Sequence, residues 1–158
     1  RVGIIDYDGS NAGVIGLLAF PDFYHVGVAS SLYDPRLVKQ GEIYMGLTTE
    51  EKRDQAVIWG DAINNLKGKL LIINGLRDRF FHPSAVFQLT DALCKANKDF
   101  EHLVQPNGGH AWRILNGRRR MWDFLVKHLL GLNPPSDFNL VTGLEIVFSD
   151  QMIEVSEE

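Results

Sequence analysis

The sequence predicts an α/β fold in which helices flank a parallel sheet. Apolar runs alternate with helical patterns in the order strand, helix, strand, long connection, strand, helix, strand, helix. This order is typical of parallel sheets built with right-handed crossovers. The first three apolar runs also lack a strict alternation of polar and apolar residues, which indicates strands that are buried on both faces.

Four short apolar runs are the predicted strands. The third run is the strongest, and the fourth is weaker and more polar. In chain order they lie at residues 2–5, 26–29, 70–73 and 100–104.

Three stretches between and after these runs have helical patterns. The first is short and apolar, the second has Pro83 at a suitable first helical position, and the third places Met121, Leu125 and Leu129 on one face. The predicted helices are residues 13–20, 83–96 and 118–130.

The end of the chain differs in character from the rest. Pro134 and Pro135 follow the last predicted helix, and the final residues are acidic. We therefore expect one domain over residues 1–132 and a C-terminal extension over residues 133–158. An isolated alternating piece at residues 144–147 has the pattern of one further strand.

The composition excludes several classes of protein. The chain has 158 residues, 45% of them hydrophobic and 23% charged, which suits one globular domain. A formal net charge of −4 argues against nucleic acid or an anionic membrane as a partner. No apolar stretch approaches the ~20 residues of a membrane span. One cysteine, no zinc-ligand spacing and no phosphate-binding glycine loop predict neither a metal nor a cofactor.

A serine, an aspartate and a histidine follow three of the predicted strands. Ser10 comes after the first strand, Asp78 after the third and His110 after the fourth. Functional residues of open α/β sheets collect beyond the carboxyl ends of the strands, so these three side chains are expected to meet there. The order Ser, Asp, His along the chain is that of the α/β-hydrolase triad.

These three residue types supply the parts of nucleophilic catalysis. A serine hydroxyl is a weak nucleophile at neutral pH, an imidazole takes its proton, and a carboxylate fixes the imidazole tautomer. Small residues such as Gly9 and Gly13 permit the tight turn into a helix that such a serine needs. Taken one at a time, a serine or an aspartate after a strand is equally typical of a helix cap or a turn.

Longer segments around these residues resemble the C-terminal part of the catalytic domain in serine peptidases of the prolyl oligopeptidase and dipeptidyl peptidase IV family. The resemblance extends over residues 1–132, in the segments RVGII, GSNAG, PDFYHVGVAS, YMGL, LKGKLLIINGLRD and QLTDALCKANKDFEHLVQPNGGHAW. It implies an α/β-hydrolase fold that lacks its N-terminal strands, with Asp78 as the triad acid and His110 as the general base. It also implies a peptide substrate and no cofactor.

The resemblance leaves two positions open for the nucleophile. The family pattern is Gly-x-Ser-x-Gly, and Ser10 fits it imperfectly because Asp8 precedes Gly9. Counting along the first strand puts Asp8 itself at the serine position, as in non-catalytic members of the family. The sequence therefore predicts either a serine peptidase that uses Ser10 or a pseudo-peptidase that acts through protein contacts. An esterase with the same triad is a third interpretation.

The remaining expectations concern the surroundings of the triad. The backbone N–H of Asn11 is expected to donate to the oxyanion, and Tyr44 and Trp112 are expected to approach the substrate pocket. In the family, the second oxyanion donor and a β-propeller domain come from upstream, whereas this chain begins at Arg1. We therefore expect a fragment with little or no hydrolytic activity of its own.

Compartment and assembly are left open by the sequence. The chain contains no signal peptide or membrane segment, and the lack of disulfides is compatible with the cytoplasm, the periplasm or secretion. A homo-oligomer is compatible with the family resemblance.

Overall fold

A computed structural model describes residues 1–6, 11–33, 59–110 and 115–137. The predicted parallel sheet is confirmed. Its four strands lie in the order β1-β2-β3-β4, and every neighbouring pair is parallel. The strands are β1 (Gly3–Ile5), β2 (Val26–Ser30), β3 (Lys69–Gly75) and β4 (Glu101–Gln105).

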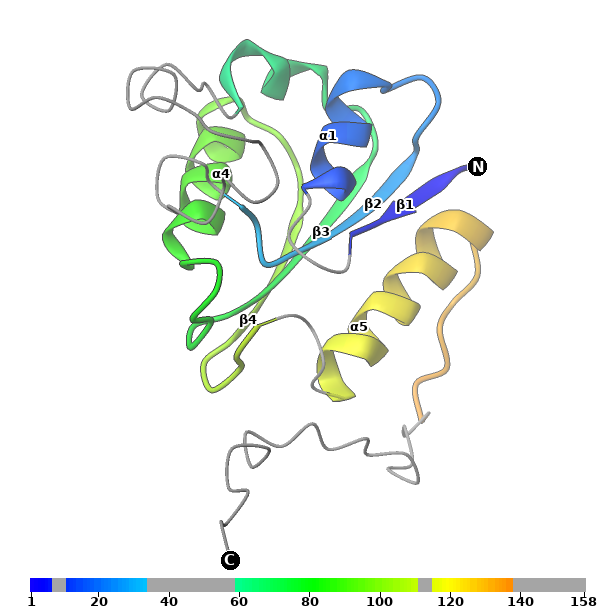
Figure 1. Cartoon of the computed structure of the whole chain (residues 1–158). Helices are drawn as coiled ribbons and strands as arrows, with labels where there is room; N and C mark the ends of the chain where they lie inside the picture. The colour runs from blue at the N-terminus through cyan, green and yellow to red at the C-terminus, as the bar shows by residue number, and fades with distance from the viewer. Residues whose placement is uncertain (7–10, 34–58, 111–114, 138–158) are drawn as a thin grey trace, which may run out of the picture.

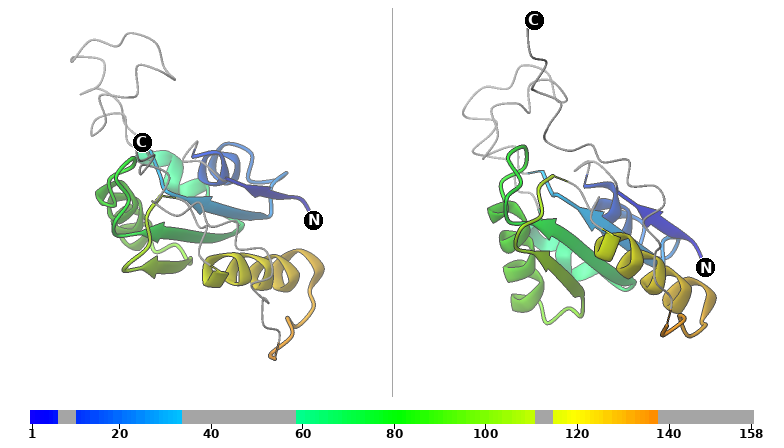
Figure 2. Two further views of the ribbon diagram at one scale, coloured as in Figure 1. Left: turned by 60° about the horizontal axis from the view of Figure 1, so that its bottom comes forward. Right: turned by 90° about the horizontal axis from the view of Figure 1, so that it is seen from below.

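Helices cover both faces of the sheet, as Figures 1 and 2 show. The helices α1 and α4 lie over one face, and α5 lies over the other. A 3₁₀ segment, η1, precedes β3, and a single π turn, η2, continues α5. The bounds are α1 (Ala12–Ala19), η1 (Gly60–Asn65), α4 (Ser84–Lys95), α5 (Leu115–Leu125) and η2 (Val126–Leu130).

The strand β3 shows why the sequence lacks alternation. Successive side chains of a strand point to opposite faces. Leu70 and Ile72 pack in the core beneath α1 and α4, whereas Leu71 and Ile73 pack in the core beneath α5. All four side chains are buried, so both faces demand apolar residues.

The structure differs most from the predicted elements at two places, the last helix and the segment η1. The last helix begins at Leu115 rather than at residue 118, with Gly117 in its first turn, and it ends in the π turn η2. The segment η1 was not predicted, because only Ile63 of its six residues is buried and no apolar periodicity results. The alternating piece at 144–147 lies outside the described residues.

A glycine brings α1 against the sheet. A Cβ at Gly13 would collide with the backbone carbonyl of Val28 in β2. The first turn of α1 can therefore approach β2 more closely than a helix with a larger residue there. The register places Ile5 beside Val28 and Ser30 beside Ile73, so the carboxyl ends of the strands meet at one edge of the sheet.

The outer strand β1 pairs with β2 alone among the described residues. Val2, just before β1, is exposed. No helix within the described part of the chain is long and apolar enough to span a membrane.

Candidate acid–base site at the carboxyl edge of the sheet

The loops after β3 and β4 are joined by backbone hydrogen bonds. The N–H of Leu76 donates to the carbonyl of Gln105 at 3.0 Å, and the N–H of Arg77 donates to the carbonyl of Gly108 at 2.9 Å. A Cβ at Gly75 would collide with the backbone of Gly108. The close approach of the two loops therefore requires a glycine at position 75, and it brings the residues that follow each strand together.

Asp78 and His110 meet across these loops. The Nδ1 atom of His110 lies 3.0 Å from Oδ2 of Asp78. The other carboxylate oxygen, Oδ1, accepts the backbone N–H groups of Phe80 at 2.8 Å and Phe81 at 2.9 Å. Asp78 is only 7% exposed. The carboxylate is thus held on both oxygens and aimed at the imidazole.

The pKa of Asp78 is lowered from its ordinary value. Burial acts to raise it, but hydrogen bonds from His110, from the backbone of Phe81 and Phe80, and from the Ser31 side chain act more strongly in the opposite direction. Hydrogen bonds to the charged form favour that form. Near neutral pH, Asp78 is therefore an ionised acceptor beside His110.

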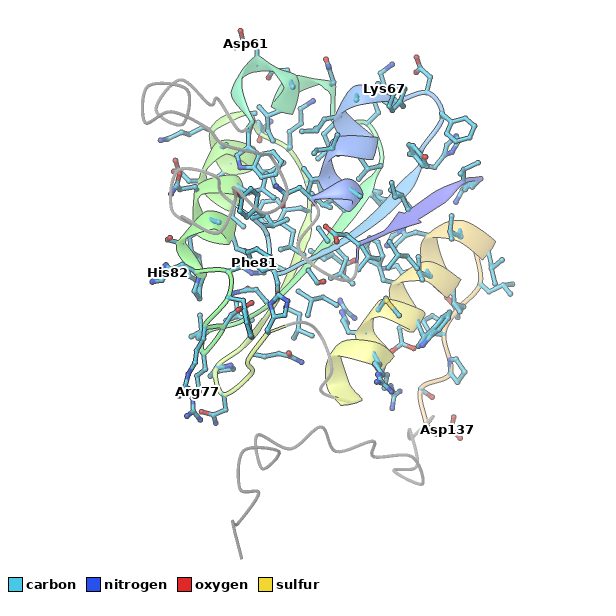
Figure 3. All side chains as sticks on the ribbon, viewed as in Figure 1. Asp61, Lys67, Arg77, Phe81, His82 and Asp137 are labelled. Atoms are coloured by element: carbon cyan, nitrogen blue, oxygen red, sulfur yellow. The ribbon has the colours of Figure 1, made fainter. Side chains whose placement is uncertain are left out.

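Aromatic rings surround the imidazole of His110. The ring centroids of Phe80 and Phe81 lie 5.1 and 5.0 Å from it. Phe81 in turn meets Tyr33 edge-on, at 5.8 Å between centroids. Figure 3 places Phe81 near the centre of the molecule, whereas Arg77 lies at the outer end of the same loop. The imidazole therefore has an apolar surround, and a carboxylate lies beside one nitrogen.

Asn11 directly precedes α1. Its backbone is left-handed, with φ of 61°, and its carbonyl accepts the N–H groups of Val14 and Ile15 in α1. Its side-chain amide pairs with the backbone of Tyr33: Oδ1 accepts the Tyr33 N–H at 2.9 Å, and Nδ2 donates to the Tyr33 carbonyl at 2.7 Å. Asparagine tolerates a positive φ better than most residues.

The structure thus brings together two of the residues that the sequence singled out, Asp78 and His110, and places Asn11 at the start of α1. Five others lie outside the described residues: Asp8, Gly9, Ser10, Tyr44 and Trp112.

Sequence reasoning missed Ser31, Phe80 and Phe81 as neighbours of the pair. Phe80 and Phe81 follow Asp78 almost directly, and this proximity was an available signal. Ser31 carries no such signal, because 47 positions separate it from Asp78 and only the pairing of β2 with β3 brings them together.

A second histidine lies on the neighbouring strand, outside this pair. Nε2 of His102 in β4 is 2.6 Å from Oδ1 of Asn74 in β3. Burial lowers the pKa of His102. Among the described residues, no group of three histidine, cysteine or acidic side chains could hold a metal ion.

The parallel sheet, the helices on both faces and the position of the Asp–His pair define the fold class as an α/β hydrolase. The chain belongs to the prolyl oligopeptidase family, whose family profile matches residues 9–131. A comparison with curated proteins found no match.

Solved structures support the same fold. Dipeptidyl peptidase 4 from Porphyromonas gingivalis is similar at a TM-score of 0.66 with 22% identity, over 83% of this chain and 19% of that one. The acylaminoacyl peptidase from Pyrococcus horikoshii is similar at 0.63 with 16% identity, over 88% of this chain and 25% of that one. Acetyl xylan esterase 1 from a Thermoanaerobacterium species is similar at 0.51 with 17% identity, over 80% of this chain and 45% of that one. The chain therefore spans at most a quarter of the two peptidases.

Proposed function

We propose that the complete protein is a serine peptidase of the prolyl oligopeptidase family, with Ser10, Asp78 and His110 as its triad. The hydrogen bond between His110 and Asp78 is the observation that carries this proposal. A buried, ionised carboxylate on Nδ1 leaves Nε2 of the same ring as the nitrogen that can take a proton from a nucleophile.

In the proposed reaction, Ser10 Oγ attacks the carbonyl carbon of a peptide bond while His110 Nε2 takes the hydroxyl proton. The tetrahedral intermediate collapses, the C–N bond breaks, and His110 returns the proton to the leaving amine. Water then attacks the acyl-enzyme, giving its proton to His110, and the acid product leaves as Ser10 regains its hydroxyl. Asp78 orients His110 and stabilises the transient imidazolium.

The start of α1 supports Ser10 as the nucleophile in this proposal. Because α1 begins at Ala12, Ser10 precedes the helix by two positions and Asp8 by four. A nucleophile at a strand-to-helix turn benefits from the N–H groups at the start of the helix. The N–H of Asn11 is the proposed oxyanion donor on this chain. Gly9 contributes the small residue that the turn needs.

A fluorophosphonate probe on the complete protein tests the proposal. We expect labelling of the wild type, and its loss in Ser10→Ala and in His110→Ala. If the folded wild type is not labelled while Asp8→Ser becomes labelled, Asp8 occupies the nucleophile position. The alternative function, a pseudo-peptidase that acts through protein contacts, would then replace the peptidase.

The choice between peptidase and esterase needs a substrate panel. The likeness to an acetyl xylan esterase keeps the esterase as the second candidate. We expect the complete protein to cleave proline-containing dipeptidyl or amino-acyl amides faster than short acyl esters of matched leaving group. The reverse preference would favour the esterase. Tyr44 and Trp112 are the proposed pocket residues for either substrate.

The family resemblance also suggests what accompanies this part of the protein. We propose a peptide substrate, an upstream β-propeller domain and the rest of the catalytic domain as its partners. A homo-oligomer is part of the same proposal, and sedimentation of the complete protein tests it.

A further inference from the structure

The segment after β2, residues 31–33, contacts both sides of the proposed site. Ser31 reaches the acid–base pair, and Tyr33 reaches the start of α1. None of these contacts belongs to the triad chemistry described above. We call this segment the β2 bridge.

Ser31 is the contact to the acid–base pair. It is 2% exposed and has a left-handed backbone with φ of 50°, and its N–H donates to the carbonyl of Ile73 at 3.3 Å. Its hydroxyl hydrogen-bonds to the carboxylate of Asp78. A buried carboxylate that loses such a donor is left less well satisfied.

Tyr33 is the contact to the start of α1. The side-chain amide of Asn11 hydrogen-bonds to both the N–H and the carbonyl of Tyr33, at 2.9 and 2.7 Å. The Tyr33 ring meets Phe81, and Phe81 packs on the ring of His110. The bridge therefore links Asn11 at the start of α1 to the imidazole of His110 and to the carboxylate of Asp78.

We propose that the β2 bridge is a positioning segment, which sets Asn11 and the start of α1 at a fixed place relative to the Asp78–His110 pair. Ser31 acts through the carboxylate of Asp78, and Asn11 acts through the backbone of Tyr33. This inference rests on the proposed function for its effect on rate, whereas the two contacts themselves can be measured without activity.

The two contacts predict two different signatures. The Ser31 hydroxyl stabilises the ionised carboxylate of Asp78, so its loss raises the pKa of Asp78 and shifts the pH profile. The Asn11 amide affects only where the start of α1 lies, so its loss lowers the labelling rate at every pH. General destabilisation would not shift the pH profile, and it would lower the labelling rate only in proportion to the unfolded fraction.

The first test compares Ser31→Ala with Ser30→Ala in the complete protein. Both delete the hydroxyl of a buried serine, but Ser30 donates to the backbone carbonyl of Asp6 rather than to Asp78. In Ser31→Ala we expect the pKa of Asp78 to rise and the midpoint of fluorophosphonate labelling to move to higher pH, because a less stabilised carboxylate holds the imidazolium more tightly. Ser30→Ala should leave both unchanged.

A third serine variant distinguishes the loss of the hydroxyl from an effect on the left-handed backbone at position 31. Ser31→Gly suits the positive φ but also lacks the donor, so it should behave as Ser31→Ala does. Carbon-13 titration of the aspartate carboxyls, with the Asp78 signal assigned by Asp78→Asn, measures the pKa without any activity. An unchanged pKa of Asp78 in Ser31→Ala overturns the role of Ser31.

The second test uses Asn11→Gly, which keeps the backbone N–H and the positive φ but removes both bonds to Tyr33. We expect about a tenfold slower labelling with an unchanged pH midpoint. Hydrogen exchange of the Tyr33 amide should become faster, and this readout does not need a catalytic protein. Labelling at the wild-type rate, or unchanged exchange at Tyr33, overturns the positioning role. If the wild type does not label but both contacts respond as expected, the proposed function fails while the bridge stands.

Discussion

The two sides of the proposed site are held in different ways. On one side, the loops after β3 and β4 fix Asp78 and His110 with backbone hydrogen bonds, which join Leu76 to Gln105 and Arg77 to Gly108. On the other side, the start of α1 is joined to Tyr33 through the side chain of Asn11.

This difference matters for how each side responds to mutation. Backbone hydrogen bonds survive most substitutions, so the acid–base side depends on sequence mainly where a side chain would collide, as at Gly75. The side next to α1 loses both of its bonds to Tyr33 when one residue changes. The acid–base pair is therefore preorganised by the fold, and Asn11 at the start of α1 is joined to Tyr33 by its own side-chain amide.

The largest effect should come from Asp78→Asn, which removes the carboxylate that His110 pairs with. The amide keeps the shape of the carboxylate but favours the wrong tautomer of His110, a change that costs roughly 10⁴-fold in turnover in a related triad. The labelling rate and the peptide hydrolysis rate of the complete protein measure it. Asp99→Asn is the control, because that exposed carboxylate pairs with Lys69 and lies outside the acid–base pair. Equal rates in Asp78→Asn and wild type would refute the role of Asp78.

Gly75→Ala should disturb the packing between the loops after β3 and β4. The new Cβ meets the backbone of Gly108, which has to move, and such overpacking typically costs about 1–3 kcal/mol of unfolding free energy. Urea unfolding measures the loss, and carbon-13 shifts of His110 report the disturbed pair. Gly109→Ala is the matched control, since a Cβ there meets no other described residue within 4 Å. A Gly75→Ala protein as stable as the control would show that the loops are not tightly joined.

Acid titration should isolate the contribution of Asp78 to the stability of the acid–base side. The pKa of Asp78 in the folded protein lies below its ordinary value of 3.8. Its contribution to stability is therefore complete above that ordinary value and is lost as the pH falls through the folded pKa. We expect Asp78→Asn to flatten the fall of unfolding free energy below about pH 4. Parallel curves for the two proteins in denaturant titrations from pH 5 to 2 would contradict this.

The smallest effect should come from His102, which lies on the acid–base side but outside the pair. Burial lowers its pKa below the ordinary 6.5, so folding is disfavoured as the pH falls from that value through the folded pKa. We expect His102→Gln to reduce the difference in unfolding free energy between pH 7 and pH 5. The same measurement on His82→Gln, at the exposed start of α4, supplies the background. A reduction of equal size in both variants would remove His102 as the cause.

Much of the fold could be predicted because burial constrains its residues. The apolar run at 70–73 indicated a doubly buried strand, and every residue of β3 after Lys69 is buried. The segment η1 escaped prediction because a short 3₁₀ segment with one buried side chain, Ile63, leaves no apolar period in the sequence. The early start of α5 escaped it because Gly117 is a poor helix former that tertiary packing overrides.

The candidate site could likewise be predicted only in part. Asp78 and His110 were predictable, since each follows a strand and the carboxyl ends of parallel strands share one edge. The role of the Asn11 side chain was not, because its partner Tyr33 is 22 positions away and offers only backbone atoms. Any residue at position 33 except proline would present the same N–H and carbonyl, so no residue type marks the contact.

The sequence by itself determined the parallel sheet, the family resemblance and the pairing of an aspartate with a histidine. Apolar runs and residue types carry that information locally, and strand order converts it into an edge where the two side chains meet. Only the tertiary structure decided what holds them. Asp78 accepts hydrogen bonds from Ser31, Phe80 and Phe81, and Asn11 hydrogen-bonds to Tyr33. These contacts depend on backbone atoms and on strand register, and neither is encoded by a motif.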